Sequence, residues 1–415
     1  EIDRAGGDVR PNTYLDEIEG GGVVLKNYLT GRAERIDDVA GVIWVGAASA
    51  NGELAKELIF ERDLVGRRRA LEERELLLRE LPLVERVELV ATAGTTSYVW
   101  SPRSVLQRQA DEARAVLDDT PAMSASLRWR ILGHLAYTAL HLGDRAALDS
   151  AIQAMTSLGP EIGAVRMSMT RLHETMRSLS GGVVSGAEQR ADELVGQLEQ
   201  LGGPEAGAYR STTTLASSRE RGAMADLWPV VDALVVGAHP VGPERTTAAF
   251  VRLLRGDLEI VRATLHDLDD QEFADDATVQ LCVAFWAEIA AGLRSDEHCA
   301  RFIDILRAAS GINLLIGGMY LGPVDRLLAL LHEARGEHAR SDELFAAAVA
   351  QQSALGSPPW VARTQLDWAS ACLARGERER SAALLDAAIT TIGRLELTDS
   401  LRRHAELAAQ LAAGS

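Results

Sequence analysis

The sequence predicts an all-α protein built largely from stacked helical hairpins, and three observations lead to this prediction. The 415 residues are 47% hydrophobic but only 5% aromatic, and only 12 of them are prolines. This composition favours long helices rich in Ala and Leu over a β-sandwich. Glycines that separate helical patterns also recur at a mean interval of about 39 residues, a period typical of helical-repeat proteins.

The repeats begin near residue 120 and continue through the rest of the sequence. In each repeat, a glycine ends one helical pattern and a polar or acidic residue begins the next, as in LARGERERSAALLDAAI and EARGEHARSDELFAAAV. Glycine can adopt the left-handed conformation that ends a helix, and an acidic residue stabilises the start of the following one. Because one hairpin cannot bury its apolar face alone, we expect residues 120–415 to form a tetratricopeptide-like α-solenoid of about seven hairpins. The turn glycines are Gly143, Gly182, Gly222, Gly256, Gly292, Gly336 and Gly376.

Residues 1–119 do not follow this period. Three helical patterns occupy residues 37–89, and the segment VELVATAGTTSYVWSP then alternates around Gly94 like a β-hairpin. Three helices followed by a hairpin predict a small winged-helix-like unit over residues 37–119. For residues 1–36 we expect an irregular segment.

Two motifs in the last repeats resemble a known family. One is a glycine-rich turn before a Leu-Gly-Pro helix start, and the other is a Pro-Trp-x-Ala-Arg-Thr-x-Leu-Asp helix. Their residues are Gly317, Gly318, Leu321, Gly322 and Pro323, followed by Pro359, Trp360, Ala362, Arg363, Thr364, Leu366 and Asp367. Together they resemble the tetratricopeptide-like sensor region of large bacterial ATP-binding LuxR-type transcriptional regulators and related ATPase-cyclase proteins.

This resemblance implies a particular domain order. In that family an ATPase module precedes a winged-helix segment and the repeats, and a helix-turn-helix DNA-binding domain often follows them. The present sequence contains no G-x-x-x-x-G-K-[ST] loop that could hold a nucleotide phosphate, and no recognition helix follows Arg402. The resemblance therefore implies either the sensor portion of a regulator whose ATPase and DNA-binding modules lie elsewhere on the natural chain, or a shorter relative that lacks both.

The charge and the cysteine content indicate which partners and which cellular compartment to expect. With 43 basic and 60 acidic side chains the net charge is −17, so we expect no direct nucleic-acid binding by the solenoid. The three cysteines, Cys282, Cys299 and Cys372, form no paired framework, and the sequence shows neither a secretory segment nor a run of 18 apolar residues. We therefore expect a cytoplasmic protein that does not associate with membranes.

The inner wall of a solenoid is lined by the first helices of its repeats, so polar residues in those helices are candidates for a concave ligand groove. These candidates are Arg130, His134, Tyr137, His141, Arg171, His173, Tyr209, Arg210, Tyr320, Asp325, Arg363 and Asp367.

For several of these residues a structural role is the favoured interpretation. His134 and His141 share one helix face, but a metal ion would need further ligands there, so we expect no metal and no cofactor. Arg363 and Asp367 lie one helical turn apart, and we favour a structural ion pair over a pair that faces the groove. Trp360 and the other tryptophans of the repeats are interpreted as packing between Ala-rich helices.

The expected function is recognition. We expect a regulatory sensor or scaffold whose groove binds a peptide, a partner protein or a small effector and thereby controls transcription or signalling. No catalytic motif is found, but the alternative is a stand-alone enzyme or small-molecule-binding protein of specialised metabolism built on the same solenoid. A deep cavity that gathers arginines, histidines and tryptophans would favour binding of a small molecule, whereas a shallow open groove would favour a peptide or protein.

Overall fold

The computed structural model describes much of the chain and divides it into two compact units, Glu1–Ala55 and Lys56–Ser415. The described residues are 13–19, 22–27, 33–36, 102–121, 123–184, 186–200, 206–235, 242–268, 273, 278–395 and 397–413. Most of the stretch for which a winged-helix-like unit is expected, residues 37–101, lies outside the described residues.

The described part of the first unit is a three-stranded antiparallel sheet. Its strands are β1 (Thr13–Glu19), β2 (Gly22–Asn27) and β3 (Ala33–Ile36), and β2 pairs with both of the others. This sheet corrects the expectation that residues 1–36 are irregular. The strands are short and contain several charged residues, so they give no clear hydrophobic alternation in the sequence.

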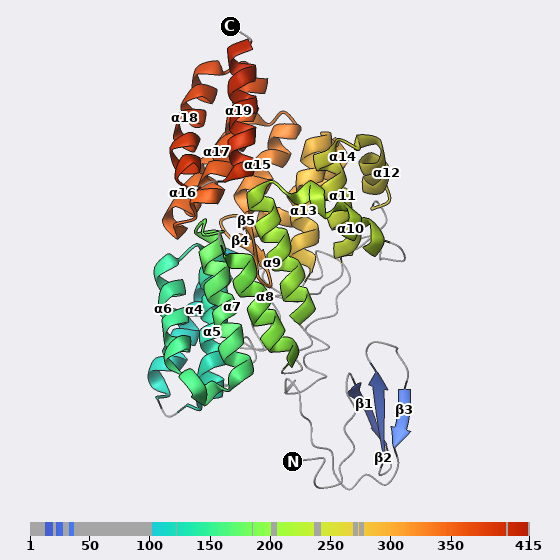
Figure 1. Ribbon diagram of the computed structural model, residues 1–415, viewed down its shortest axis with the longest axis vertical. Coiled ribbons are helices and arrows are strands. Elements are labelled where there is room, and N and C mark those ends of the chain that lie inside the picture. The colour runs from blue at the N-terminus through green and yellow to red at the C-terminus, as the bar shows by residue number, and fades with distance from the viewer. Residues whose placement is uncertain are drawn as a thin grey trace. The chain divides into compact units, whose positions relative to one another are not determined.

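The described part of the second unit is almost entirely helical, which confirms the all-α prediction at the level of fold class (Figure 1). Its helices are α4 (Arg103–Asp119), α5 (Ala125–Leu142), α6 (Arg145–Ser157), η3 (Gly159–Ile162), α7 (Ala164–Ser180), α8 (Ala187–Gln200), α9 (Ala206–Arg221), η4 (Met224–Leu227), α10 (Trp228–Leu234), α11 (Pro243–Arg255), α12 (Leu258–His266), α13 (Val279–Leu293), α14 (Asp296–Leu306), η5 (Arg307–Ala309), α15 (Val324–Ala334), α16 (His338–Leu355), α17 (Pro358–Ala374), α18 (Arg378–Leu395) and α19 (Thr398–Ala413). No helix among the described residues is long and apolar enough to cross a bilayer.

Helices that follow one another along the chain pack together, as α5 does with α6, α7 with α8, α15 with α16 and α17 with α18. The helix α4 belongs to this packing although its residues were expected in the winged-helix-like unit. Ala110, Ala113 and Val116 of α4 are buried in the same hydrophobic cluster as Ile131 and Leu135 of α5. Their spacing of three residues places them on one face of α4.

Most of the predicted turn glycines end helices as expected. Gly143, Gly182, Gly222, Gly256, Gly336 and Gly376 all have positive φ angles between 71° and 89°. The prediction for Gly292 is wrong, because this glycine lies inside α13. Arg294 ends that helix instead and adopts a left-handed conformation with φ of 51°.

A β-hairpin interrupts the helices between α14 and α15. Its strands are β4 (Asn313–Ile316) and β5 (Met319–Pro323), so the Leu-Gly-Pro motif expected to start a helix lies in a strand, and α15 begins at Val324. Gly322 has φ of +95°, and a Cβ atom there would lie 2.2 Å from the ring of Trp360. Only glycine allows the indole to pack so close to the strand.

The hairpin is hydrogen-bonded to helices that lie far away in the sequence. The side chain of Asn313 donates to the carbonyl oxygen of Leu140 on α5 over 2.6 Å. The Leu315 amide donates to Gln280 Oε1 on α13 over 2.8 Å, and the Gly318 amide donates to the Thr212 hydroxyl on α9 over 3.1 Å. The hairpin thus ties early helices of this unit to later ones.

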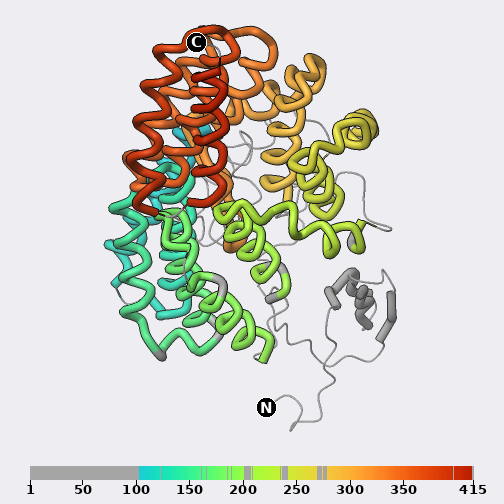
Figure 2. Tube along the Cα trace, turned by 45° about the horizontal axis from the view of Figure 1, so that its top comes forward, coloured from blue at the N-terminus to red at the C-terminus, as the bar shows by residue number. Residues whose placement is uncertain are grey.

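Later helices also contact early ones directly, α17 with α7 and α19 with α9 (Figure 2). The Ser357 hydroxyl next to α17 donates to the carbonyl oxygen of Ser180 on α7 over 2.7 Å. A Cβ atom added to Gly222, which follows α9, would lie 3.1 Å from the Cβ atom of Asp399 on α19. These contacts bring α9 and α19 to the same region of the unit.

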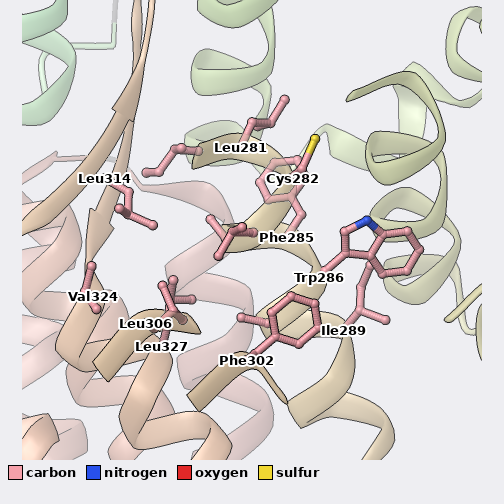
Figure 3. Close-up of a cluster of buried hydrophobic side chains, with 14 of the residues drawn as sticks. Leu281, Cys282, Phe285, Trp286, Ile289, Phe302, Leu306, Leu314, Val324 and Leu327 are labelled. Atoms are coloured by element: carbon pink, nitrogen blue, oxygen red, sulfur yellow. The ribbon is translucent and has the colours of Figure 1, made fainter. Parts of the chain in front are cut away.

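The largest apolar cluster among the described residues centres on α13 (Figure 3). Phe285, Trp286 and Ile289 of this helix are fully buried, together with Phe302 of α14 and Leu327 of α15. The indole nitrogen of Trp286 donates to the Thr246 hydroxyl on α11 over 2.8 Å. A helix that is apolar on nearly all sides, as α13 is, lies in the interior of a domain.

Candidate functional site

A cavity of about 640 Å³ lies among six of the long helices of the second unit. Residues of α9, α11, α13, α15, α17 and α19 line it, together with η4. On α13, α15 and α17 the lining includes small residues, among them Ala291, Gly292, Ala334, Ala371 and Ala374. Small side chains on facing helices leave space between them, which explains why the cavity forms here.

Charged side chains dominate the polar part of this lining. The arginines are Arg219, Arg294, Arg326, Arg363, Arg402 and Arg403, and the acidic residues are Glu288, Glu333, Asp367, Asp399 and Glu406. The arginines come from five helices or their ends, so the fold rather than a local motif gathers them.

The innermost of these charges form one connected network. Arg219 Nη2 donates to both oxygens of Glu288, over 2.6 and 2.9 Å, and Arg326 Nη1 donates to Glu288 over 3.0 Å. Arg326 Nε also donates to Asp367 over 2.6 Å. Arg403 Nη2 donates to the other oxygen of Asp367 over 2.7 Å. The network therefore joins α9, α13, α15, α17 and α19.

The ionisation of this network follows from its geometry. Burial alone would raise the pKa of Glu288, but Arg219 and Arg326 outweigh it and hold that pKa far below its usual range. The pKa of Asp367 is lowered in the same way, because Arg326 and Arg403 outweigh the effect of burial. Both carboxylates are therefore ionised at neutral pH, and breaking one of these pairs leaves a buried charge.

Trp360 of α17 lies against three of the guanidinium groups. Its ring centroid is 5.1 Å from the guanidinium carbon of Arg219, 5.5 Å from that of Arg326 and 5.0 Å from that of Arg363. Tyr320 of β5 packs edge-on against the same ring at 5.6 Å. The buried indole is a packing residue, and its π face also stabilises the cations around it.

Two of the twelve groove candidates, Arg363 and Asp367, line this cavity. The expected ion pair between them is not what the structure contains. Asp367 is bonded to Arg326 and Arg403, and Arg363 Nη2 lies 3.4 Å from each carboxylate oxygen of Glu220. Both residues therefore pair with other helices. Arg363 lies against α9, and Asp367 lies between α15 and α19.

The candidates on α5 and α7 lie away from this cavity. His134, His141 and His173 are buried, Tyr137 packs edge-on against His173 at 5.0 Å, Arg130 is half-buried, and Arg171 is exposed. The His141 Nδ1–H donates to the carbonyl oxygen of Asn313 over 2.5 Å, and burial lowers the pKa of His141 to about 4. His173 Nδ1 bonds to the Met169 carbonyl oxygen over 2.8 Å. These histidines join helices to each other and to the hairpin.

The remaining candidates are also placed outside the cavity lining. Tyr209 is half-buried, and exposed Arg210 bonds to Glu199 over 3.1 Å. The Tyr320 hydroxyl donates to Gln352 over 2.7 Å, and buried Asp325 accepts from Ser310 and from the Gly311 amide. Tyr320 and Asp325 thus hold the hairpin and the turn before it, whereas Arg210 joins α9 to α8.

Four residues that carry most of the network were not among the candidates from the sequence: Arg219, Glu288, Arg326 and Arg403. A signal for Glu288 is present, since it is the single charged residue in the apolar segment VQLCVAFWAEIAAGL. A charge in such a helix requires a buried partner. Which arginines supply it depends on the fold, because Arg219 lies 69 residues and Arg326 38 residues away.

Among the described residues, no group of three or more His, Cys, Asp and Glu side chains could hold a metal ion. The cavity instead offers guanidinium donors, carboxylate acceptors and apolar wall, a combination suited to holding an organic molecule by its polar groups. No protein-family model matches this chain, and no curated protein matches it at a significant level of similarity.

Proposed function

We propose that this chain is a sensor module that binds a small effector in the cavity between α9, α13, α15, α17 and α19. The module is a tetratricopeptide-like solenoid, and effector binding controls a transcriptional or signalling output. The observation that carries the proposal is the arginine-rich cavity of about 640 Å³, which is in the range of small-molecule sites.

The composition of the cavity wall supports a small molecule over a peptide or partner protein. Its polar groups converge from five helices on one region, and apolar residues such as Leu253 and Leu330 line the rest. The volume suits a metabolite, whereas a folded partner needs an interface that buries roughly 1,200–2,000 Å².

The helix arrangement also offers a way for the effector to act. Both α9 and α19 contribute to the cavity, and Arg403 of α19 is held through Asp367 of α17. A ligand that bonds to these groups favours one arrangement of α19 against α17 over another. Such differential binding is what a regulator requires in order to shift a population.

Thermal denaturation against a panel of metabolites tests the proposal. Under the proposal one class of compound stabilises the wild-type chain, by about 2.7 kcal/mol at roughly 100 times its Kd. Ser370→Phe, which adds a ring to the lining from α17, abolishes the effect, whereas Ala383→Phe on the exposed face of α18 retains it. Equal stabilisation of both variants would place binding elsewhere. Conversion of the compound to a product would instead support the enzyme alternative.

A further inference from the structure

Two buried guanidinium N–H groups of arginines that line the cavity lack hydrogen-bond partners among the described residues. They are Arg219 Nη1 and Arg363 Nε. The side chains of Arg219 and Arg363 are only 5% and 4% exposed, and both residues line the cavity. A buried charged donor without an acceptor is costly, so these two atoms point to an acceptor that the described residues do not supply.

The pairing of Arg363 points the same way. Four arginines, Arg219, Arg326, Arg363 and Arg403, are paired with three carboxylates, those of Glu220, Glu288 and Asp367. Of these pairs the weakest is that of Arg363, whose Nη2 lies 3.4 Å from both oxygens of Glu220. Charge-assisted hydrogen bonds are usually about 2.7–2.9 Å long. Arg363 is therefore the arginine of this cluster whose counter-charge lies farthest from it.

The two arginines that carry these donors lie beside the same tryptophan ring. The guanidinium carbons of Arg219 and Arg363 lie 5.1 and 5.0 Å from the same Trp360 ring centroid. Arg219 is further fixed by the two bonds from its Nη2 to Glu288, while its buried Nη1 has no partner among the described residues. Two preorganised guanidinium groups match the oxygens of a carboxylate or a phosphate.

We infer that the ligand of this cavity is a small organic oxoanion, a carboxylate or a phosphate ester, whose anionic group accepts hydrogen bonds from Arg219 Nη1 and Arg363 Nε. This inference rests on the proposed function and adds the chemical class of the effector. A further buried polar atom gives the ligand an orientation. Glu333 Oε2 in the same lining has no partner among the described residues, and Glu333 lies two helical turns, about 10 Å, beyond Arg326 on α15. The end of the ligand opposite the anion therefore carries a hydrogen-bond donor.

The first test is binding measured by titration calorimetry on the full chain with matched probes. The probes are glycerol 3-phosphate against glycerol, and succinate against succinamide, at constant ionic strength. The anions should bind at least tenfold more tightly than their neutral analogues, and the better anion identifies the group. If, in both pairs, the anion and its neutral analogue bound equally well, the inference would be overturned.

Substitutions locate the anion. The double variant Arg363→Met/Glu220→Met removes both partners of one buried pair, so it leaves no unpaired charge and preserves the fold. It should weaken anion binding at least tenfold. Arg177→Gln, which removes an arginine paired with Asp149 outside the cavity, should change binding less than twofold. Wild-type affinity in the double variant would overturn the assignment of Arg363.

Crystals of the full chain soaked in selenate give the geometry directly. The selenium anomalous peak should lie within hydrogen-bond distance of Arg219 Nη1 and Arg363 Nε, and it should vanish in the double variant. Selenate bound only elsewhere would overturn the inference. A neutral molecule that co-purifies with the wild-type chain but not with Ser370→Phe would also overturn it, while leaving the proposed small-effector function intact.

Discussion

Among single residues, Glu288 carries the largest share of the buried charge network. Its carboxylate accepts from both Arg219 and Arg326, and its side chain is only 11% exposed. Glu288→Gln keeps the shape but leaves two buried cations without their common counter-charge. We expect the free energy of unfolding to fall by about 3–5 kcal/mol, measured by urea denaturation.

Glu343→Gln is the matched control for this change. Glu343 pairs with Arg340 over 2.7 Å, but the two side chains are 67% and 54% exposed. A solvent-exposed pair contributes little, so the expected loss is at most about 0.5 kcal/mol. Similar losses for the two variants would contradict a tightly coupled network at Glu288.

Because His141 is buried, we expect the free energy of unfolding to depend on pH. Burial is the main reason that its pKa falls from 6.5 to about 4 in the folded chain. The unfolded chain therefore binds more protons between these two values, and the stability that is present above pH 6.5 is lost as the pH falls towards 4. We expect this residue to contribute a loss of about 2 kcal/mol between pH 7 and pH 4.5.

His141→Asn isolates this contribution. The Asn amide places a donor near the position of Nδ1, which bonds to Asn313, but it does not titrate. Urea denaturation at pH 7 and pH 4.5 should show a smaller pH effect in the variant than in the wild type. His173, whose pKa burial also lowers, acts equally in both chains. An unchanged pH effect would show that His141 is not a buried neutral histidine.

The role of single residues was only partly accessible from the sequence. Arg363 and Asp367 could be singled out because they belong to a recognisable motif, yet their partners could not. Arg363 reaches Glu220 across 143 residues, and Asp367 reaches Arg326 and Arg403 across 41 and 36 residues. Such pairs depend on the packing of helices, which local patterns do not specify.

At the scale of elements, the β4–β5 hairpin depends on the close approach of Gly322 and Trp360. Gly322→Ala would place a Cβ atom 2.2 Å from the indole at φ of +95°. Backbone strain and overpacking then act together, and we expect a loss of about 2–5 kcal/mol in the free energy of unfolding. Chemical denaturation followed by tryptophan fluorescence measures it.

Gly336→Ala separates the two causes. Gly336 has a similar positive φ of 77°, but a Cβ atom there would meet nothing within 4 Å. This variant reports backbone strain alone, and its expected cost is about 1 kcal/mol. If both variants cost the same, the contact with Trp360 would not constrain the hairpin.

Elements that are defined by local signals could be predicted well. Glycines such as Gly143 and Gly376 end helices because the residue there adopts a left-handed conformation. A glycine between two helical patterns is therefore visible in the sequence as a helix end. The signal fails where another residue meets the requirement, as Arg294 does two residues after Gly292. The hairpin was missed because the Leu-Gly-Pro motif of β5 also fits the start of a helix.

At the scale of the whole molecule, the periodic sequence predicted the all-α class but not the cavity. The period of the glycines indicates only that helices alternate with turns along the chain. It does not predict that α17 contacts α7, that α19 contacts α9, or that the hairpin bonds to α5, α9 and α13. These contacts between distant segments gather the arginines, so the candidate site became visible only in the folded chain.

Native mass spectrometry measures directly whether the cavity holds a small molecule. The wild-type chain is measured as purified and after incubation with a metabolite extract, and the same samples are then denatured to release what they carry. We expect a small molecule that is retained by the wild type and by Ala383→Phe but not by Ser370→Phe. A wild-type chain that carries no small molecule under either condition would contradict it.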